Sequence, residues 1–279
     1  MLRQRLISAT VFLPVIAASI WLGDIWFSLI IGAAALLGFH EFRQLVSKKG
    51  QTPLLFPGLL LIAAIMYFAY RGEIYSVWLL PVIVLLPLIW VVLRSLISHA
   101  GAEGAFGDWL WTLGGTIYVG WLLSFWILLR GNFGWEWTLL AILSTFAVDS
   151  MAYFTGRAWG RHPLAPGISP GKSCEGAAGG IITGVAVVVI LSYLLGLIEA
   201  SPFSTVLGSQ VEIWKVLVLG IVVGVFAQVG DLAESMLKRG AGVGESSTLI
   251  PGHGGILDRL DSLLFTGVLT YYYLYMVIL

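Results

Sequence analysis

The sequence predicts an all-α polytopic integral membrane protein, and the main evidence is its amino-acid composition. Hydrophobic residues fill 58% of the 279 positions and charged residues only 11%, against roughly 25% charged residues in an ordinary soluble domain. The mean hydropathy is +0.94. A water-soluble globule would lack the polar side chains to cover its surface, and a disordered chain would be far more polar. The bilayer is therefore the expected solvent for most of the chain.

Nine apolar stretches have the length of about 20 residues that a transmembrane helix needs. The first follows a basic start, and its apolar run continues into the second, so we interpret it as an uncleaved helix rather than a signal peptide. We expect one membrane domain, with N-terminal spans over about 1–130 and a catalytic region over about 137–279. In chain order the expected spans are 7–22, 25–40, 54–70, 74–93, 109–129, 137–155, 177–198, 213–230 and 262–279.

The distribution of basic residues predicts the orientation. With nine alternating spans, one side receives three basic residues, Arg71, Arg130 and Lys215. The other side receives twelve, and an excess of Lys and Arg marks the cytoplasmic side of a membrane protein. The amino terminus and the two longest connections, 156–176 and 231–261, are therefore expected in the cytoplasm. The twelve are Arg3, Arg5, Arg43, Lys48, Lys49, Arg94, Arg157, Arg161, Lys172, Lys238, Arg239 and Arg259.

Glycines recur at four-residue spacing in two of the expected spans. Gly176, Gly180 and Gly184 lie in or just before the seventh span, and Gly220 and Gly224 lie in the eighth. Small residues at this spacing let helix backbones approach each other closely in a membrane. We expect these two helices to pack tightly and to hold the two long loops together.

The connection 231–261 contains three acids that are candidates for a metal site. Asp231 follows an apolar span, and Asp258 and Asp261 are three residues apart where the next helix is expected to begin. Carboxylates crowded at a membrane boundary repel one another unless cations lie between them, and oxygen ligands completed by substrate phosphates suit Mg²⁺. Four basic side chains share the segment: Lys238, Arg239, His253 and Arg259.

Two interpretations of this segment remain open from the residues alone. In one, the basic side chains form salt bridges that neutralise the acids. In the other, acids and bases around a Gly- and Pro-rich turn form a phosphoryl-transfer site. The turn around His253 leads into a helix whose first N–H groups favour an anion. His253 would then donate to a phosphate or orient a metal ligand.

The other long connection contains Gly171-Lys172-Ser173, which resembles part of a phosphate-binding loop. The full motif requires a glycine at position 166, where this chain has Pro166, so the match fails. A turn over 169–173 that leads into a helix could still hold a phosphate through backbone N–H groups and a lysine. The candidates are Ser169, Gly171, Lys172 and Ser173.

Further candidates lie within or beside the spans. Asp149 lies inside the expected span 137–155, where a carboxylate indicates a functional role, although a hydrogen bond to a neighbouring helix would also explain it. His40, Glu41 and Arg43, at the end of the second span, either contact the site or form a solvated helix end.

Charge and cysteine content exclude other classes of partner and site. The chain carries 15 Lys and Arg against 15 Asp and Glu, whereas nucleic-acid binding usually requires a basic excess. No nucleic-acid partner is therefore expected. Cys174 is the single cysteine, which excludes an internal disulfide and a cysteine-based zinc site.

Several of these motifs together resemble the signature of the phosphatidate cytidylyltransferase (CDP-diacylglycerol synthase) family. The carboxyl-terminal signature covers 235–239 and 248–261, and the stretches 149–154 and 169–176 are also similar. The resemblance implies transfer of a cytidylyl group from CTP to phosphatidate, with CDP-diacylglycerol and pyrophosphate as products. It also implies Mg²⁺, with K⁺ as a candidate second cation, and it matches the family's metal-binding acids to Asp231 and Asp258.

This chain departs from the family pattern at Gly244-Glu245, where the family usually has Lys-Asp. If that lysine holds a triphosphate, its loss weakens nucleotide binding or slows the reaction. Ser173 also replaces a usual threonine and keeps the hydroxyl.

The resulting hypothesis is an enzyme of the inner membrane that meets CTP from the cytoplasm and phosphatidate from the inner leaflet. Lys172, Lys238, Arg239 and Arg259 are the candidate phosphate contacts. A homodimer is one arrangement that the sequence leaves open. The alternatives are a cytidylyltransferase for another lipid phosphate, a lipid-alcohol kinase and a cation-coupled transporter; a transporter would need acids along the whole path across the membrane, whereas most of these cluster at one face.

Overall fold

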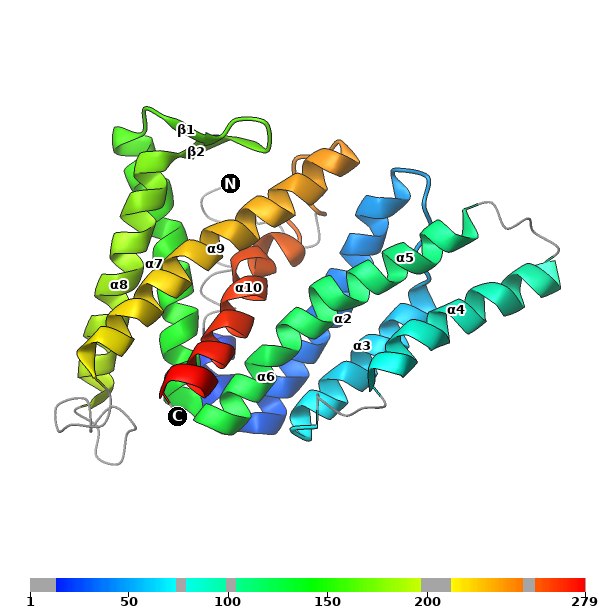
Figure 1. Cartoon of the computed structure of the whole chain (residues 1–279), viewed down its shortest axis with the longest axis horizontal. Helices are drawn as coiled ribbons and strands as arrows, with labels where there is room; N and C mark the ends of the chain where they lie inside the picture. The colour runs from blue at the N-terminus through cyan, green and yellow to red at the C-terminus, as the bar shows by residue number, and fades with distance from the viewer. Residues whose placement is uncertain (1–13, 74–78, 99–103, 197–211, 248–253, 279) are drawn as a thin grey trace. The chain divides into compact units, whose positions relative to one another are not determined.

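The computed structural model describes most of the chain and is almost entirely helical (Figure 1). The chain divides into two compact units. Unit 1 comprises Met1–Gly131 and Leu237–Asp258, and unit 2 comprises Asn132–Met236 and Arg259–Leu279. The described residues are 14–73, 79–98, 104–196, 212–247 and 254–278.

Unit 1 is built from apolar helices that pack around aromatic and branched aliphatic side chains. Helix α2 packs against α3, and a π-helical stretch, η1, packs against both. Phe27, Phe39, Leu61 and Ile62 are almost completely buried among them. After a helical segment over 14–22, the elements are α2 (Asp24–Ser47), α3 (Leu55–Tyr70), α4 (Leu79–Ser98), α5 (Ala105–Gly115), η1 (Thr116–Trp121) and α6 (Leu122–Phe133).

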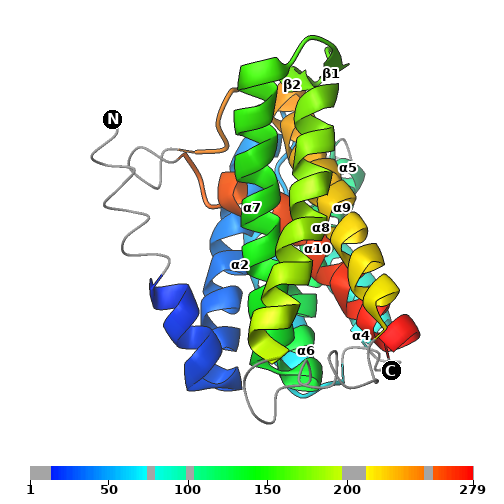
Figure 2. The same ribbon diagram turned by 90° about the vertical axis from the view of Figure 1, so that its left-hand side faces the viewer.

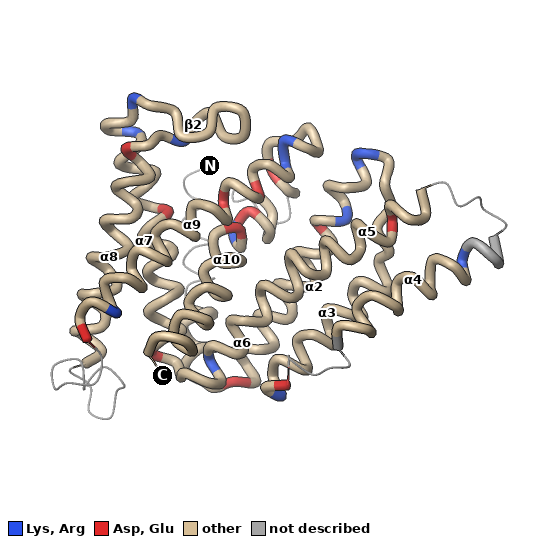
Figure 3. Tube along the Cα trace, in the orientation of Figure 1, with Lys and Arg blue, Asp and Glu red and all other residues tan. Residues whose placement is uncertain are grey.

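Unit 2 combines long helices with one small β-hairpin. Helices α7 and α8 run side by side, and the hairpin lies at one end of the pair (Figures 1 and 2). Lys and Arg gather around this hairpin (Figure 3), whereas α8 carries no charge from 176 to 196. The elements are α7 (Trp135–Trp159), β1 (Pro163–Ala165), β2 (Ser169–Ser173), α8 (Cys174–Gly196), α9 (Ile213–Ala241), α10 (Leu257–Tyr273) and the π-helical η2 (Leu274–Ile278); α9 ends and α10 begins in unit 1.

The helical class of the prediction is confirmed, and the number of crossings is confirmed only in part. The described residues include five helices that are long and apolar enough to span a membrane: Asp24–Ser47, Ala105–Phe133, Trp135–Trp159, Cys174–Gly196 and Ile213–Ala241. Two shorter apolar helices cover Leu55–Tyr70 and Leu80–Arg94. Nine crossings therefore remain a prediction, and parts of the first and fourth expected spans, 7–13 and 74–78, lie outside the described residues.

The structure corrects the expected extent of the loop 231–261. Helix α9 continues through Asp231 to Ala241, and α10 begins at Leu257 rather than at 262. The continuation of α9 is rich in good helix formers such as Ala, Glu, Leu and Lys. Lys238 and Arg239 occupy its last turn, where cations interact favourably with the helix dipole.

The structure also corrects the loop 156–176, because 169–173 is a strand and not a turn. Strand β2 pairs antiparallel with β1, so its backbone groups are used in the hairpin. Glu175, in the first turn of α8, accepts hydrogen bonds from the backbone N–H groups of Arg161 and His162 and contacts the His162 ring. The hairpin is thereby fixed to the start of α8.

The predicted close packing of the two glycine-bearing helices is confirmed. The Cβ of any larger residue at Gly184 would lie 2.9 Å from the Gly220 carbonyl oxygen, and one at Gly220 would lie 2.5 Å from the Val185 Cα. Gln228 of α9 adds a hydrogen bond from its side-chain amide to the Ala177 carbonyl oxygen at 3.0 Å. Helices α8 and α9 therefore contact each other backbone to backbone inside unit 2.

Replacement of Gly220 by valine should destabilise the protein by about 1–3 kcal/mol, because the new side chain must push two backbones apart. Thermal unfolding of the purified protein in detergent would measure the loss. Gly240→Ala is the matched control on the same helix, since a Cβ there meets nothing within 4 Å; it should leave stability unchanged or raise it slightly. Equal melting temperatures for Gly220→Val and wild type would contradict the backbone contact.

Candidate active site

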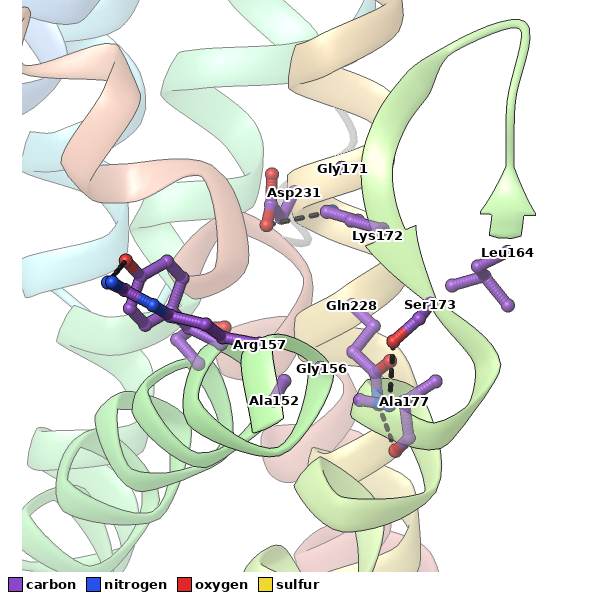
Figure 4. A pocket seen from close by; sticks show the side chains of 13 residues that line it. Ala152, Gly156, Arg157, Leu164, Gly171, Lys172, Ser173, Ala177, Gln228 and Asp231 are labelled. Carbon is purple, nitrogen blue, oxygen red and sulfur yellow. Dashed lines mark hydrogen bonds and ion pairs between the residues drawn. The ribbon is translucent and has the colours of Figure 1, made fainter. Parts of the chain in front are cut away.

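Unit 2 contains a pocket of about 450 Å³ at its hairpin end, within the range of roughly 300–1,000 Å³ that ligand sites occupy. Helices α7, α8 and α9 and the hairpin line it (Figure 4). Its polar lining includes Asp149, Arg157, Lys172, Gln228 and Asp231. The pocket therefore presents both carboxylates and basic groups to a ligand.

An ion pair joins the hairpin to α9 beside this pocket. The Lys172 ammonium nitrogen lies 2.7 Å from Asp231 Oδ2, and the two side chains are 22% and 34% exposed. Figure 4 shows Lys172 directed from the strand toward Asp231. Removal from water strengthens the attraction between the two charges, and it also makes either charge costly if left alone.

Two more acids of unit 2 lie near Asp231. Asp149 lines the pocket and accepts a hydrogen bond from the Ser262 hydroxyl of α10 at 2.9 Å. Asp261 interacts electrostatically with both Asp231 and Asp149. Asp149 thus makes the interhelical hydrogen bond that was one of the two explanations for a carboxylate at this position. It also faces the pocket. Three carboxyl groups in one region repel one another when they are ionised, and a cation would relieve this repulsion.

The phosphate-loop candidates fall into two groups. Gly171, Lys172 and Ser173 line the pocket, whereas Ser169 is not among the residues that form it. The Ser173 hydroxyl accepts a hydrogen bond from the Gly176 N–H at 3.1 Å, which is the bond of a helix N-cap. Ser173 therefore starts α8 as well as facing the pocket.

In unit 1, Asp258 is enclosed by donors. Its Oδ1 accepts from the Lys238 ammonium at 2.6 Å. Its Oδ2 accepts from the Ser246 hydroxyl at 2.8 Å and from the N–H groups of Ser246 and Gly255, each at 2.9 Å. Burial raises the pKa of the Asp258 carboxyl, but the hydrogen bonds from Lys238, Gly255 and Ser246 outweigh it and lower the pKa to about 2. Asp258 is therefore ionised at neutral pH.

The carboxylate of Glu41, a residue of α2, lies at the amino end of α10. It is 2% exposed. Its Oε1 accepts from the Ile256 N–H at 2.9 Å and the Ser247 hydroxyl at 2.6 Å. Its Oε2 accepts from the Leu257 N–H at 2.8 Å and lies 3.2 Å from the Ser246 Oγ, whose one proton it shares with Asp258. The anion predicted at the start of this helix is thus a side chain of the protein itself.

The sequence indicated this role for Glu41 only weakly. The two interpretations considered were contact with the site and a solvated helix end, and burial removes the second. Gly38, Glu41 and Leu45 are all buried on α2, and their spacing of three and four residues places them on one helix face. An acid in register with an apolar face was the available signal.

Two side chains that line the pocket were not among the candidates predicted from the sequence. Tyr153 and Arg157 line the pocket, and the Arg157 guanidinium donates to the Tyr153 hydroxyl at 3.2 Å. They follow Asp149 at four-residue intervals on α7, which is the spacing of one helix face.

The remaining predicted candidates differ in what the structure shows of them. Arg239 and Arg259 are exposed. His253 lies outside the described residues.

The donor set suits Mg²⁺ only with help from a ligand. Asp149 and Asp231 supply carboxylates to one pocket, but in the part of the chain that the structure describes, no three His, Cys, Asp or Glu side chains are arranged to hold a metal ion. Mg²⁺ is commonly held by one or two carboxylates together with substrate phosphates. The residues present therefore fit a metal that enters with a phosphorylated substrate.

Comparison with known proteins identifies the family of the chain. The sequence profile of the cytidylyltransferase family matches residues 3–277. The chain is 31% identical to a phosphatidate cytidylyltransferase of Haemophilus influenzae, with 94% of this chain and 95% of the relative covered. It is 33% identical to the phosphatidate cytidylyltransferase of Pseudomonas aeruginosa, with 94% and 93% covered. The chain belongs to the cytidylyltransferase family.

Proposed function

We propose that this protein is a phosphatidate cytidylyltransferase that converts CTP and phosphatidate into CDP-diacylglycerol and pyrophosphate. The observation that carries the proposal is the family match over residues 3–277, together with relatives of that name that align over nearly their whole length. The pocket of unit 2 supports it, because carboxylates and a lysine face one space at the end of apolar helices. Such a site suits two phosphorylated substrates, one of which is a lipid.

The proposed reaction is an in-line displacement at the α-phosphorus of CTP. An oxygen of the phosphatidate phosphate forms a bond to this phosphorus, and the bond to the α,β-bridging oxygen breaks. Pyrophosphate leaves with the electron pair. Because a phosphate monoester is largely ionised at neutral pH, with a second pKa of about 6, the nucleophile needs no strong general base. Positioning and charge stabilisation would supply most of the catalysis.

The lysines are proposed to exchange partners when the substrates bind. Lys172 lies against Asp231 and Lys238 against Asp258. Each ammonium group would turn from its carboxylate to a phosphate oxygen, which offers a comparable charge-assisted hydrogen bond. The two carboxylates would then be available as oxygen ligands. Arg239 and Arg259, both exposed, are further candidates for phosphate contacts.

A magnesium ion is proposed to be held by Asp231 and Asp258, with Asp261 near it and with Asp149 as the candidate for a second cation such as K⁺. When bound, the magnesium ion would neutralise phosphate charge and draw electron density from the α-phosphorus. The support for this assignment is the electrostatic coupling among Asp149, Asp231 and Asp261 and the ionised state of Asp258.

A cytoplasmic active site is proposed from the positions of the basic residues. Arg157 lies in the last turn of α7, and Arg161 and Lys172 lie in the hairpin region at the same end of unit 2. An excess of Lys and Arg marks the cytoplasmic side of membrane proteins. CTP would reach the pocket from water there, while phosphatidate would enter from the inner leaflet.

Purified protein should convert labelled CTP and phosphatidate into CDP-diacylglycerol in the presence of Mg²⁺, and Asp258→Asn should lower turnover by roughly a hundredfold or more. The asparagine retains the size of the side chain but loses the charge that would bind the cation. Asp24→Asn is the matched control, since Asp24 pairs with Arg130 at 2.9 Å elsewhere in unit 1. Near-wild-type turnover of folded Asp258→Asn would remove the metal assignment.

Gly244→Lys should lower the KM for CTP by about two- to fivefold, as expected for one additional partly exposed ion pair with the nucleotide. Gly244 is exposed, and a Cβ there meets nothing within 4 Å, so a long side chain fits without strain. Gly244→Gln has a similar size and no charge, and it should leave KM unchanged. Equal KM values for all three proteins would show that position 244 does not contact the nucleotide.

A further inference from the structure

A buried carboxylate on α2 holds a segment that lies about two hundred positions later in the sequence. Glu41 uses both of its oxygens. Each oxygen accepts one backbone N–H group, Oε1 also accepts the Ser247 hydroxyl, and Oε2 shares the single proton of the Ser246 hydroxyl with Asp258. A buried charge is costly unless it is hydrogen-bonded. These donors satisfy it, and two of them, the N–H groups of Ile256 and Leu257, belong to the start of α10, where the helix dipole also favours an anion.

Only a carboxylate meets this set of donors. The Ile256 N–H points to Oε1 and the Leu257 N–H points to Oε2. A glutamine at position 41 would have to turn its own NH₂ group toward one of these two N–H groups. Unlike a serine hydroxyl, a backbone N–H cannot rotate to another acceptor, and a buried donor without an acceptor is strongly unfavourable.

Glu41 is linked to Asp258 through one hydroxyl. The Ser246 Oγ lies 3.2 Å from Glu41 Oε2 and 2.8 Å from Asp258 Oδ2. The Ser246 N–H also donates to Asp258, at 2.9 Å. Any displacement of the segment that Glu41 holds would therefore carry the donors of Asp258 with it.

We propose that Glu41 is a positioning residue for the cytidylyl transfer: it holds Ser247 and the start of α10 through three hydrogen bonds, shares the Ser246 hydroxyl with Asp258, and so sets the place and orientation of the Asp258 carboxylate. Glu41 does not contact the substrates in this proposal. The proposal rests on the proposed function for its kinetic consequence, but its structural part, the ordering of this segment, stands apart from any activity.

The test compares Glu41→Gln with wild type in full-length protein reconstituted in lipid nanodiscs. Hydrogen–deuterium exchange in a peptide containing Ile256 and Leu257 should be about tenfold faster in the variant without any added metal or substrate. The kcat should fall roughly tenfold to a hundredfold, as expected for a misplaced catalytic group. The Mg²⁺ concentration that gives half-maximal turnover should rise, which partial unfolding of the sample would not cause.

Glu73→Gln is the matched control, because it makes the same chemical change on an exposed acid of unit 1. It should leave both exchange and kinetics unchanged. If Glu41→Gln yields no folded protein, Ser247→Ala decides the question, since it removes a donor of Glu41 and none of the donors of Asp258 described above. Ser247→Ala should raise the half-maximal Mg²⁺ concentration, and an unchanged concentration would overturn the positioning role.

The outcomes separate the two proposals. Faster exchange together with a raised Mg²⁺ requirement supports the positioning role. Unchanged exchange in Glu41→Gln, or a kcat and Mg²⁺ requirement equal to those of wild type, overturns it. If wild-type protein makes no CDP-diacylglycerol while exchange still depends on Glu41, the proposed function fails and the ordering of the segment is retained.

Discussion

The structure depends on the requirement that every carboxylate near an apolar span has a partner of opposite charge or a set of hydrogen-bond donors. Asp231 is paired with Lys172 at 2.7 Å and Asp258 with Lys238 at 2.6 Å. Glu41 instead uses hydroxyl and backbone N–H groups. In each case the partner comes from another segment of the chain, so satisfying the charge also fixes the tertiary arrangement.

The same requirement links stability to function in the proposed enzyme. The acids and lysines are partners in the absence of substrate, and two polyanionic substrates would bring phosphates for the lysines and a cation for the acids. In the proposed enzyme, the ion pairs would be the resting arrangement of the phosphoryl-transfer site. The sequence allowed two interpretations of these residues, neutralising salt bridges or a catalytic site. The same residues are compatible with both.

The sequence predicted the helical class and the approximate positions of the helices, because apolar runs and glycine spacing are local signals. It did not predict that α9 continues to Ala241, although the helix formers of this stretch are a local signal. It also did not predict that 169–173 forms a strand, which depends on pairing with β1. The acids Asp231 and Asp258 were identified through their motif as candidate metal ligands, and that role stays a prediction. The donors around Glu41 were not identified, because hydrogen bonds across more than two hundred residues leave no local pattern.

The proposal that the whole mechanism needs is that Asp231 and Asp258 are ligands of one cation. Its most direct test is the Mg²⁺ concentration for half-maximal turnover in Asp231→Glu, Asp258→Glu and the double variant, which all keep a carboxylate at each site. We expect each single change to raise this concentration. The fold-increase in the double variant should differ clearly from the product of the two single fold-increases, because ligands of one ion are coupled. Two independent effects that simply multiply, or no effect of either change, would contradict the account.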